Sequence, residues 1–191
     1  MEKAPISENQ TEVKKEKVYL YHMVPEDMQG TTLHPLNSMK GTHPELYLSK
    51  AAKYTGRERV MENFIPTLEC AWNDVLHFSA VNPEEIKKSL IEAGMSPRQL
   101  KFYQIDPSLL DPEKTTIYLY QEKMSEDKMN KENFSEYNSE KLAEHSILPQ
   151  VTKDYYKEKF GKSERPLMFV GVPHILHKGS VDISDFPVIV V

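Results

Sequence analysis

Apolar and polar residues alternate along this chain in short segments rather than in long amphipathic stretches. Segments that are rich in β-branched and aromatic residues and are bounded by Gly, Pro, Asn or Asp are typical of strands. Such segments cover 18–24, 75–78, 100–106, 115–120, 166–170, 172–177 and 186–191. We therefore expect a protein that is built mainly from short strands.

Helix-capping residues predict a smaller number of helices than of strands. Asn82 followed by Pro83 is typical of an N-cap and a first helical position, and Gly94 is typical of a helix end. Comparable signals predict helices over 43–55, 57–64 and 152–160. Because the strands outnumber the helices and do not alternate regularly with them, the predicted fold class is α+β, with mixed, mostly antiparallel sheets and peripheral helices.

The domain organisation follows from the distribution of apolar residues. Residues 1–16 are almost all polar, with alternating Lys and Glu, which predicts a disordered N-terminal arm. Residues 17–191 contain enough apolar residues to form a single α+β domain. Within this domain, Glu, Lys, Ser, Asn and Met dominate 121–150, which predicts a mobile polar insertion near the surface.

The charge and the cysteine content narrow the class of protein and its location. The 24 basic and 29 acidic residues give a net charge of -5, so the overall charge does not favour nucleic-acid binding, although a local basic groove would permit it. Cys70 is the only cysteine, which excludes an internal disulfide and favours a reducing cytoplasm. No apolar run approaches the ~20 residues of a membrane span.

The candidate site centres on the stretch 72–84, which contains the only Trp of the chain. A predicted buried strand brings His77 and Ser79 to a tight corner, and the helix capped by Asn82 follows directly. His22 ends the first predicted strand in a similar way. Two interpretations remain open: these side chains bind a ligand, or they satisfy buried backbone groups.

Metal binding and nucleophilic catalysis are weaker interpretations of the same residues. His174 and His177 are three residues apart on a predicted strand, so their side chains point to opposite faces, and Cys70 has no second cysteine. No metal ligands are therefore assigned, and a histidine-based metal-binding protein remains a second alternative. Ser79 lacks the glycines of a nucleophile elbow, and the chain contains no phosphate loop.

Three motifs together resemble those of the ADP-ribosyltransferase fold. Tyr21-His22 at the end of the first strand resembles its first motif, and Leu76-His77-Phe78-Ser79 before an Asn-Pro helix start resembles its second. The segment from His174 to Ile183 resembles the third motif, in which a catalytic Glu leads a strand. The similarity is closest to small bacterial toxin-type enzymes that modify DNA and to their uncharacterised relatives.

This resemblance implies a split sheet and a site that binds NAD or another nucleotide. It implies catalytic roles for His22, Ser79 and His174, and cofactor-binding roles for His22, His77, Ser79 and Asn82. His174 stands where the family has its catalytic Glu. A His cannot stabilise an oxocarbenium-like centre as a carboxylate does. Either the chemistry differs, or another acid such as Asp182 or Glu164 supplies the charge, or NAD hydrolysis and transfer are lost.

The expected function is therefore that of an ADP-ribosyltransferase-like protein that binds NAD or another nucleotide, active or catalytically degenerate. The alternative is a non-enzymatic bacterial effector or regulatory protein that acts through a protein partner. The polar segment 121–150 suits that alternative. Such an effector would work in the cytoplasm of the bacterium or of a host cell.

Overall fold

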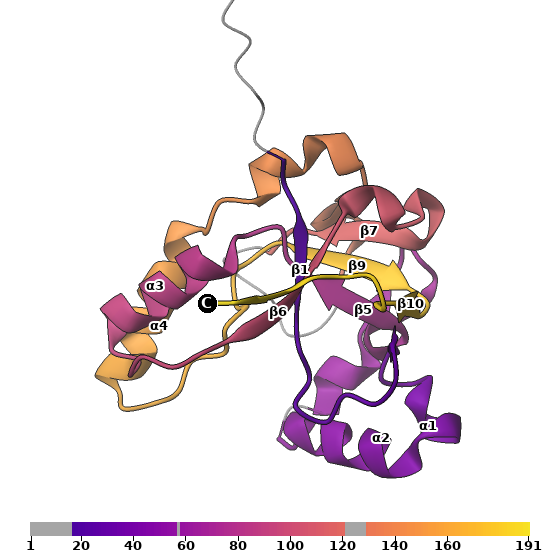
Figure 1. Cartoon of the computed structure of the whole chain (residues 1–191), viewed down its shortest axis with the longest axis horizontal. Helices are drawn as coiled ribbons and strands as arrows, with labels where there is room; N and C mark the ends of the chain where they lie inside the picture. Colours follow the sequence, from indigo (N-terminus) through magenta and orange to yellow (C-terminus); the bar gives the residue numbers. More distant parts are fainter. Residues whose placement is uncertain (1–16, 57, 121–128) are drawn as a thin grey trace, which may run out of the picture.

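The chain folds into an α+β structure in which every described strand pair is antiparallel. The computed structural model describes residues 17–56, 58–120 and 129–191 (Figure 1). The predicted arm at 1–16 and the first part of the predicted insertion lie outside these residues. The α+β class is confirmed, and the expected mixture of parallel and antiparallel pairs is not found among the described strands.

One sheet has three strands in the order β1-β6-β11. Its strands are β1 (Leu20–Met23), β6 (Lys101–Ile105) and β11 (Val188–Val190). Phe102 at its centre is fully buried, as expected for a strand with neighbours on both sides. Segments from the beginning, the middle and the end of the described chain therefore lie side by side.

A second sheet has four strands in the order β5-β9-β7-β8. Its strands are β5 (Val75–Phe78), β9 (His174–Lys178), β7 (Thr115–Tyr118) and β8 (Phe134–Glu136). Two smaller strand pairs lie outside these sheets: β2 (Thr32–Leu33) with β10 (Val181–Asp182), and β3 (Phe64–Ile65) with β4 (Cys70–Ala71).

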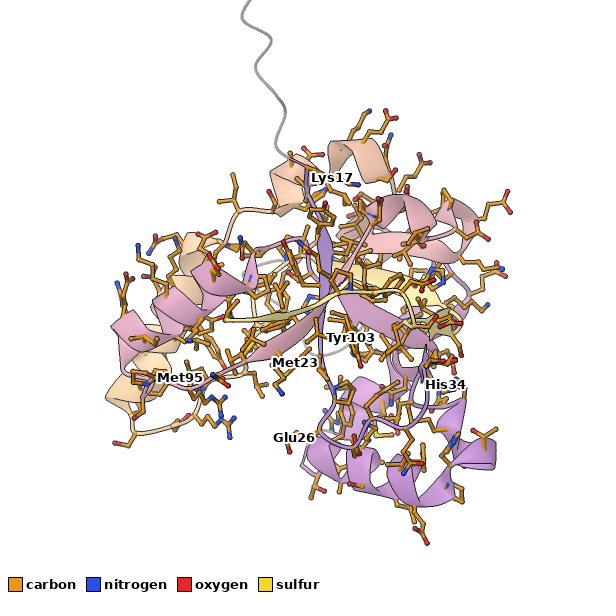
Figure 2. The ribbon with its side chains drawn as sticks, in the orientation of Figure 1. Lys17, Met23, Glu26, His34, Met95 and Tyr103 are labelled. Carbon is orange, nitrogen blue, oxygen red and sulfur yellow. The ribbon has the colours of Figure 1, made fainter. Side chains whose placement is uncertain are left out.

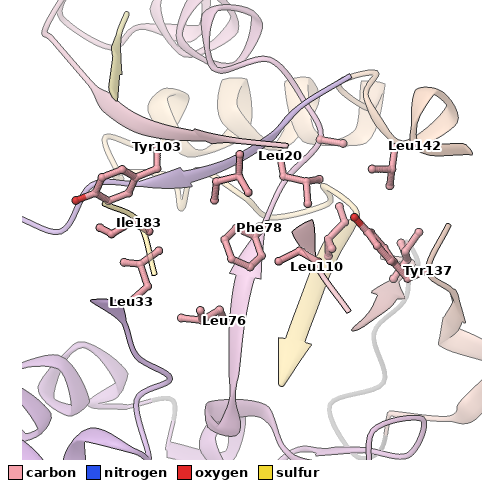
Figure 3. Close-up of a cluster of buried hydrophobic side chains, with 13 residues drawn as sticks. Leu20, Leu33, Leu76, Phe78, Tyr103, Leu110, Tyr137, Leu142 and Ile183 are labelled. Carbon is pink, nitrogen blue, oxygen red and sulfur yellow. The ribbon is translucent and has the colours of Figure 1, made fainter. Parts of the chain in front are cut away.

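The main hydrophobic core lies between the two larger sheets, whose strands run across one another (Figure 3). Leu20 and Ile105 enter it from the first sheet, and Phe78 and Ile175 enter it from the second. Alternate residues of a strand face opposite sides, so Leu76 and Phe78 face this core while Val75 packs into a separate cluster on the other face. Each larger sheet therefore has one face in the shared core.

Four α-helices are described: α1 (Met39–Thr42), α2 (Pro44–Ala51), α3 (Pro83–Ala93) and α4 (Gln150–Gly161). Asn82 caps α3 by accepting a hydrogen bond from the backbone of Glu84, and Gly94 ends it with φ 126°, both as predicted. Helices α3 and α4 lie side by side at one end of the molecule, and α1 and α2 lie at another (Figure 1). Side chains surround the ribbon in all of these parts (Figure 2).

The remaining helical turns are short 3₁₀ segments. They are η1 (Ala52–Tyr54), η2 (Glu58–Glu62), η3 (Trp72–Asp74), η4 (Pro107–Leu109), η5 (Pro112–Lys114), η6 (Lys131–Asn133) and η7 (Ser139–His145). The helix predicted over 57–64 is therefore wrong in type. The first helix is also shorter than predicted, because α2 begins after His43 and ends at Ala51.

Two further predictions differ from the structure. The segment 166–170, predicted as a strand, forms turns, and its Met168 carbonyl accepts a hydrogen bond from the buried Tyr156 hydroxyl of α4. The described part of the predicted polar insertion contains β8, and its Phe134 and Leu142 are buried in two clusters. Few apolar residues suffice there because β8 joins the edge of an existing sheet through backbone hydrogen bonds.

Gly171 lies where the turns after α4 pass close to that helix. Its φ is +80°, and a Cβ there would lie 2.7 Å from the buried Oγ1 of Thr152. We expect Gly171→Ala to lower the free energy of unfolding by about 2–3 kcal/mol in urea titrations, from left-handed backbone strain plus overpacking. Gly30→Ala is the control, because φ there is +70° with nothing within 4 Å. Equal losses in both variants would contradict the close contact.

Candidate functional site

A backbone bridge joins the two larger sheets at the predicted site. The N–H of Tyr21 donates to the carbonyl of Ser79 at 2.8 Å, and the N–H of Ser79 donates to the carbonyl of Tyr21 at 3.0 Å. β1 therefore lies against the end of β5. This brings His22 beside His77.

The His22 side chain contacts β5, and the His77 side chain contacts the preceding turn η3. Nδ1 of His22 lies 2.8 Å from the carbonyl oxygen of His77, and the His22 ring lies 5.6 Å from that of Phe78. Nε2 of His77 lies 3.2 Å from the carbonyl oxygen of Trp72, and these two rings are 4.6 Å apart. Both histidines are half-buried, whereas Met23 next to His22 is exposed at the surface (Figure 2).

His174 begins β9, the strand next to β5, and completes the group. Its ring is 6.0 Å from the His77 ring, and its Nδ1 lies 2.6 Å from the carbonyl oxygen of Val172. Three aromatic rings surround it, at centroid distances of 6.1 Å for Trp72, 6.3 Å for Tyr118 and 6.5 Å for Phe169. We call His22, His77, His174, Trp72, Tyr118 and Phe169 the histidine–aromatic cluster.

The hydrogen bonds define the tautomer of each histidine. A carbonyl oxygen only accepts, so the ring nitrogen that contacts it must carry the hydrogen. Nδ1 is therefore the donor in His22 and His174, and Nε2 is the donor in His77. In the neutral rings, the opposite nitrogen of each carries a lone pair that accepts a hydrogen bond. The cluster thus supplies three acceptor nitrogens.

The surroundings keep these imidazoles neutral. Burial is the largest cause that lowers the pKa of His77 to about 3, and the nearby His174 and His22 lower it further. Burial also lowers the pKa of His22 and of His174. Since a buried charge without an opposite charge is costly, the cluster favours a ligand that donates hydrogen bonds over an anionic group.

Two other predicted site residues have structural contacts. Ser79 is buried, and its Oγ accepts a hydrogen bond from the N–H of Val81, which holds the corner between β5 and α3. Asn82 is exposed and caps α3. Ser79 and Asn82 follow His77 closely in the sequence, but their hydrogen bonds stabilise the backbone of the corner and of the helix start.

The two acids proposed to replace a catalytic Glu are engaged elsewhere. Asp182 lies on β10, is exposed and accepts hydrogen bonds from Ser184, which lower its pKa. Glu164 forms an ion pair with Lys159 of α4. Within the described part of the chain, no carboxylate forms a hydrogen bond or ion pair with His22, His77 or His174.

Neither a metal site nor a membrane helix is found in the described ranges. No three His, Cys, Asp or Glu side chains among those residues are arranged to hold a metal ion. His174 and His177 lie on opposite faces of β9, as predicted: His174 joins the cluster, whereas His177 contacts the Thr115 hydroxyl. Among the helices of 17–56, 58–120 and 129–191, none is long and apolar enough to cross a membrane.

The sequence pointed to the three histidines as candidate site residues but did not point to two of their aromatic neighbours, Tyr118 and Phe169. Trp72 belongs to the central stretch, while Tyr118 and Phe169 come from segments far along the chain. Tyr118 reaches His174 because these two residues are paired across β7 and β9. Strand registers of this kind leave no local signal in a single sequence.

Comparison of the chain with protein-family models, with curated proteins and with solved structures finds no match.

Proposed function

We propose that the protein binds NAD or a related nucleotide at the histidine–aromatic cluster. The observation that carries this proposal is the convergence of three neutral imidazoles from β1, β5 and β9, each with one nitrogen available as an acceptor. The split between two antiparallel sheets at this point supports the suspected ADP-ribosyltransferase-like fold.

The chemistry of the cluster fits the nicotinamide riboside part of NAD. Ribose hydroxyls and the carboxamide group donate hydrogen bonds, and neutral imidazole nitrogens accept them. Aromatic faces attract a cationic ring, which the nicotinamide of NAD is. His22, His77 and His174 would contact the donors, and the half-buried Phe169 would offer part of the aromatic surface.

The proposed activity is binding without transfer of ADP-ribose. Transfer passes through an oxocarbenium-like centre that a carboxylate stabilises. In the described residues, no acid forms a hydrogen bond or ion pair with the three histidines, and the motif resemblance aligns His174 with the family's catalytic Glu. We therefore infer a catalytically degenerate, ligand-binding member of this type of fold.

A thermal-shift titration tests this proposal. A ligand that binds only the folded state stabilises it by RT ln(1 + [L]/Kd), which is about 2.7 kcal/mol at a hundredfold excess over Kd. We expect NAD to raise the unfolding temperature of the wild type. His22→Ala should weaken binding at least tenfold, which is about 1.4 kcal/mol or one good hydrogen bond.

His43→Ala is the matched control. His43 lies at the start of α2, its side chain hydrogen-bonds with the neighbouring Thr42, and its ring lies near that of His34. It should bind NAD as the wild type does. No thermal shift at millimolar NAD, or equal binding by both variants, would contradict the proposal and favour the alternative of a protein that acts through a protein partner. If the protein released nicotinamide from NAD, this would contradict the inferred loss of ADP-ribose transfer.

A further inference from the structure

The outer edge of β11 is unpaired in the described structure. β11 is the last strand of the sheet β1-β6-β11, and only β6 pairs with it among the described strands. It crosses the front of the molecule in Figure 1. An exposed strand edge offers a row of backbone donors and acceptors to another strand.

The hydrogen-bond pattern identifies which groups face outward. In an antiparallel pair, alternate residues direct their N–H and C=O toward the partner strand. Val191 exchanges both hydrogen bonds with Leu100 of the β6 side, and the Pro187 carbonyl accepts from Gln104. By this alternation Ile189 also faces β6. Val188 and Val190 therefore direct two N–H and two C=O groups away from the sheet.

The edge is apolar and uncharged. Val188 is 47% and Val190 is 53% exposed, which is unusual for valines on a strand. The segment from Phe186 to Val191 contains no charged residue. Natural proteins commonly protect an edge with charged side chains, but β11 itself carries none. Pro187 does not block the edge, because its backbone faces β6.

We propose that β11 pairs with β11 of a second copy of this chain, and that the protein is a two-fold symmetric dimer with one continuous six-stranded sheet. An antiparallel pair centred on Ile189 places Val188 opposite Val190 of the partner. All four outward backbone groups of each chain are then satisfied at once. A two-fold axis uses the same patch on both subunits, so this edge is complementary to itself.

The side chains and charges around the edge fit this occupant. Ile189 is half-buried in the cluster formed by Tyr21, Leu100 and Phe102, and the partner's copy of this residue would extend that cluster. Beyond Val191, α3 contributes two lysines and two glutamates to a shallow hollow, namely Glu84, Lys87, Lys88 and Glu92. Asp185 of the second chain would approach this mixed surface without meeting a surface of like charge.

The test is the mass of the protein in solution. Light scattering over a range of concentrations up to the millimolar level should approach twice the 22.1 kDa of one chain. Val190→Pro removes one outward N–H without touching the bonds to β6, and Val188→Lys adds a charge to the edge. Both variants should remain monomeric. Leu167→Lys, at a residue that is 47% exposed outside the sheets, should still form the dimer.

Hydrogen exchange of the Val188 and Val190 amides gives a second measurement on the wild type. Exchange at these two positions should slow as the protein concentration rises, because each amide gains a partner only in the dimer. A monomer at all concentrations, or a dimer that persists in both edge variants, would overturn the proposal. Slower exchange only after a foreign peptide is added would assign the edge to another partner and overturn it as well.

Discussion

Phe78→Ala lowers the free energy of unfolding by about 3–5 kcal/mol, the range for removal of a large side chain from a packed core. The ring of Phe78 is 2% exposed and lies between the two larger sheets (Figure 3). Leu20 and Ile175 belong to the same core cluster. The truncation removes buried apolar surface and leaves a cavity where the sheets meet, so both sheets lose packing.

Urea unfolding followed by circular dichroism measures this loss. Phe64→Ala is the control, because Phe64 is also on a strand but is 55% exposed, and it should cost less than about 1 kcal/mol. Should Phe78→Ala not fold, Phe78→Leu keeps most of the volume and should cost less than about 1.5 kcal/mol. Similar losses for Phe78→Ala and Phe64→Ala would contradict the assigned face of β5.

Acid destabilises the protein at pH values where ordinary carboxylates are still charged. The pKa of His77 is lowered to about 3 in the folded chain, against a reference value of about 6.5 when unfolded. Below pH 6.5 the unfolded chain therefore binds a proton that the folded chain does not, so stability falls as the pH falls. Between pH 6.5 and 5 this single group should remove about 1.5 kcal/mol. His22 and His174 act in the same direction, because burial lowers the pKa of each.

Comparison of urea unfolding at pH 6.5 and at pH 5 measures the effect. His77→Gln cannot be protonated in this range, and its amide can still donate to the Trp72 carbonyl, so its stability should depend less on pH. Phe64→Ala removes no titratable group and should keep the full dependence of the wild type. An unchanged dependence in His77→Gln would show that His77 does not stay neutral in the folded chain.

The sequence alone predicted the local elements around the site. Apolar runs identified β5 and β6, and Asn82, Pro83 and Gly94 identified the limits of α3. These features depend on a few neighbouring residues, either through side-chain alternation or through a capping hydrogen bond. They could therefore be read without the rest of the chain.

The wrong secondary-structure predictions concern segments whose conformation depends on contacts with distant parts of the chain. The apolar run at 166–170 has the composition of a strand, yet it forms turns and packs against α4. β8 lies in a segment of polar composition and is a strand because it pairs with β7. Its residues do not by themselves indicate that partner.

In the candidate site too, some features could be predicted from the sequence and others depend on long-range contacts. The sequence placed His22, His77 and His174 on strands, and the alternation of side chains separated His174 from His177. Only the tertiary structure decided that the three histidines meet, because the bridge between Tyr21 and Ser79 and the pairing of β5 with β9 are long-range backbone hydrogen bonds. The neutral state of the rings was decided at that level too, since burial by distant parts of the chain lowers the pKa of each ring and outweighs the carbonyl contacts, which raise it.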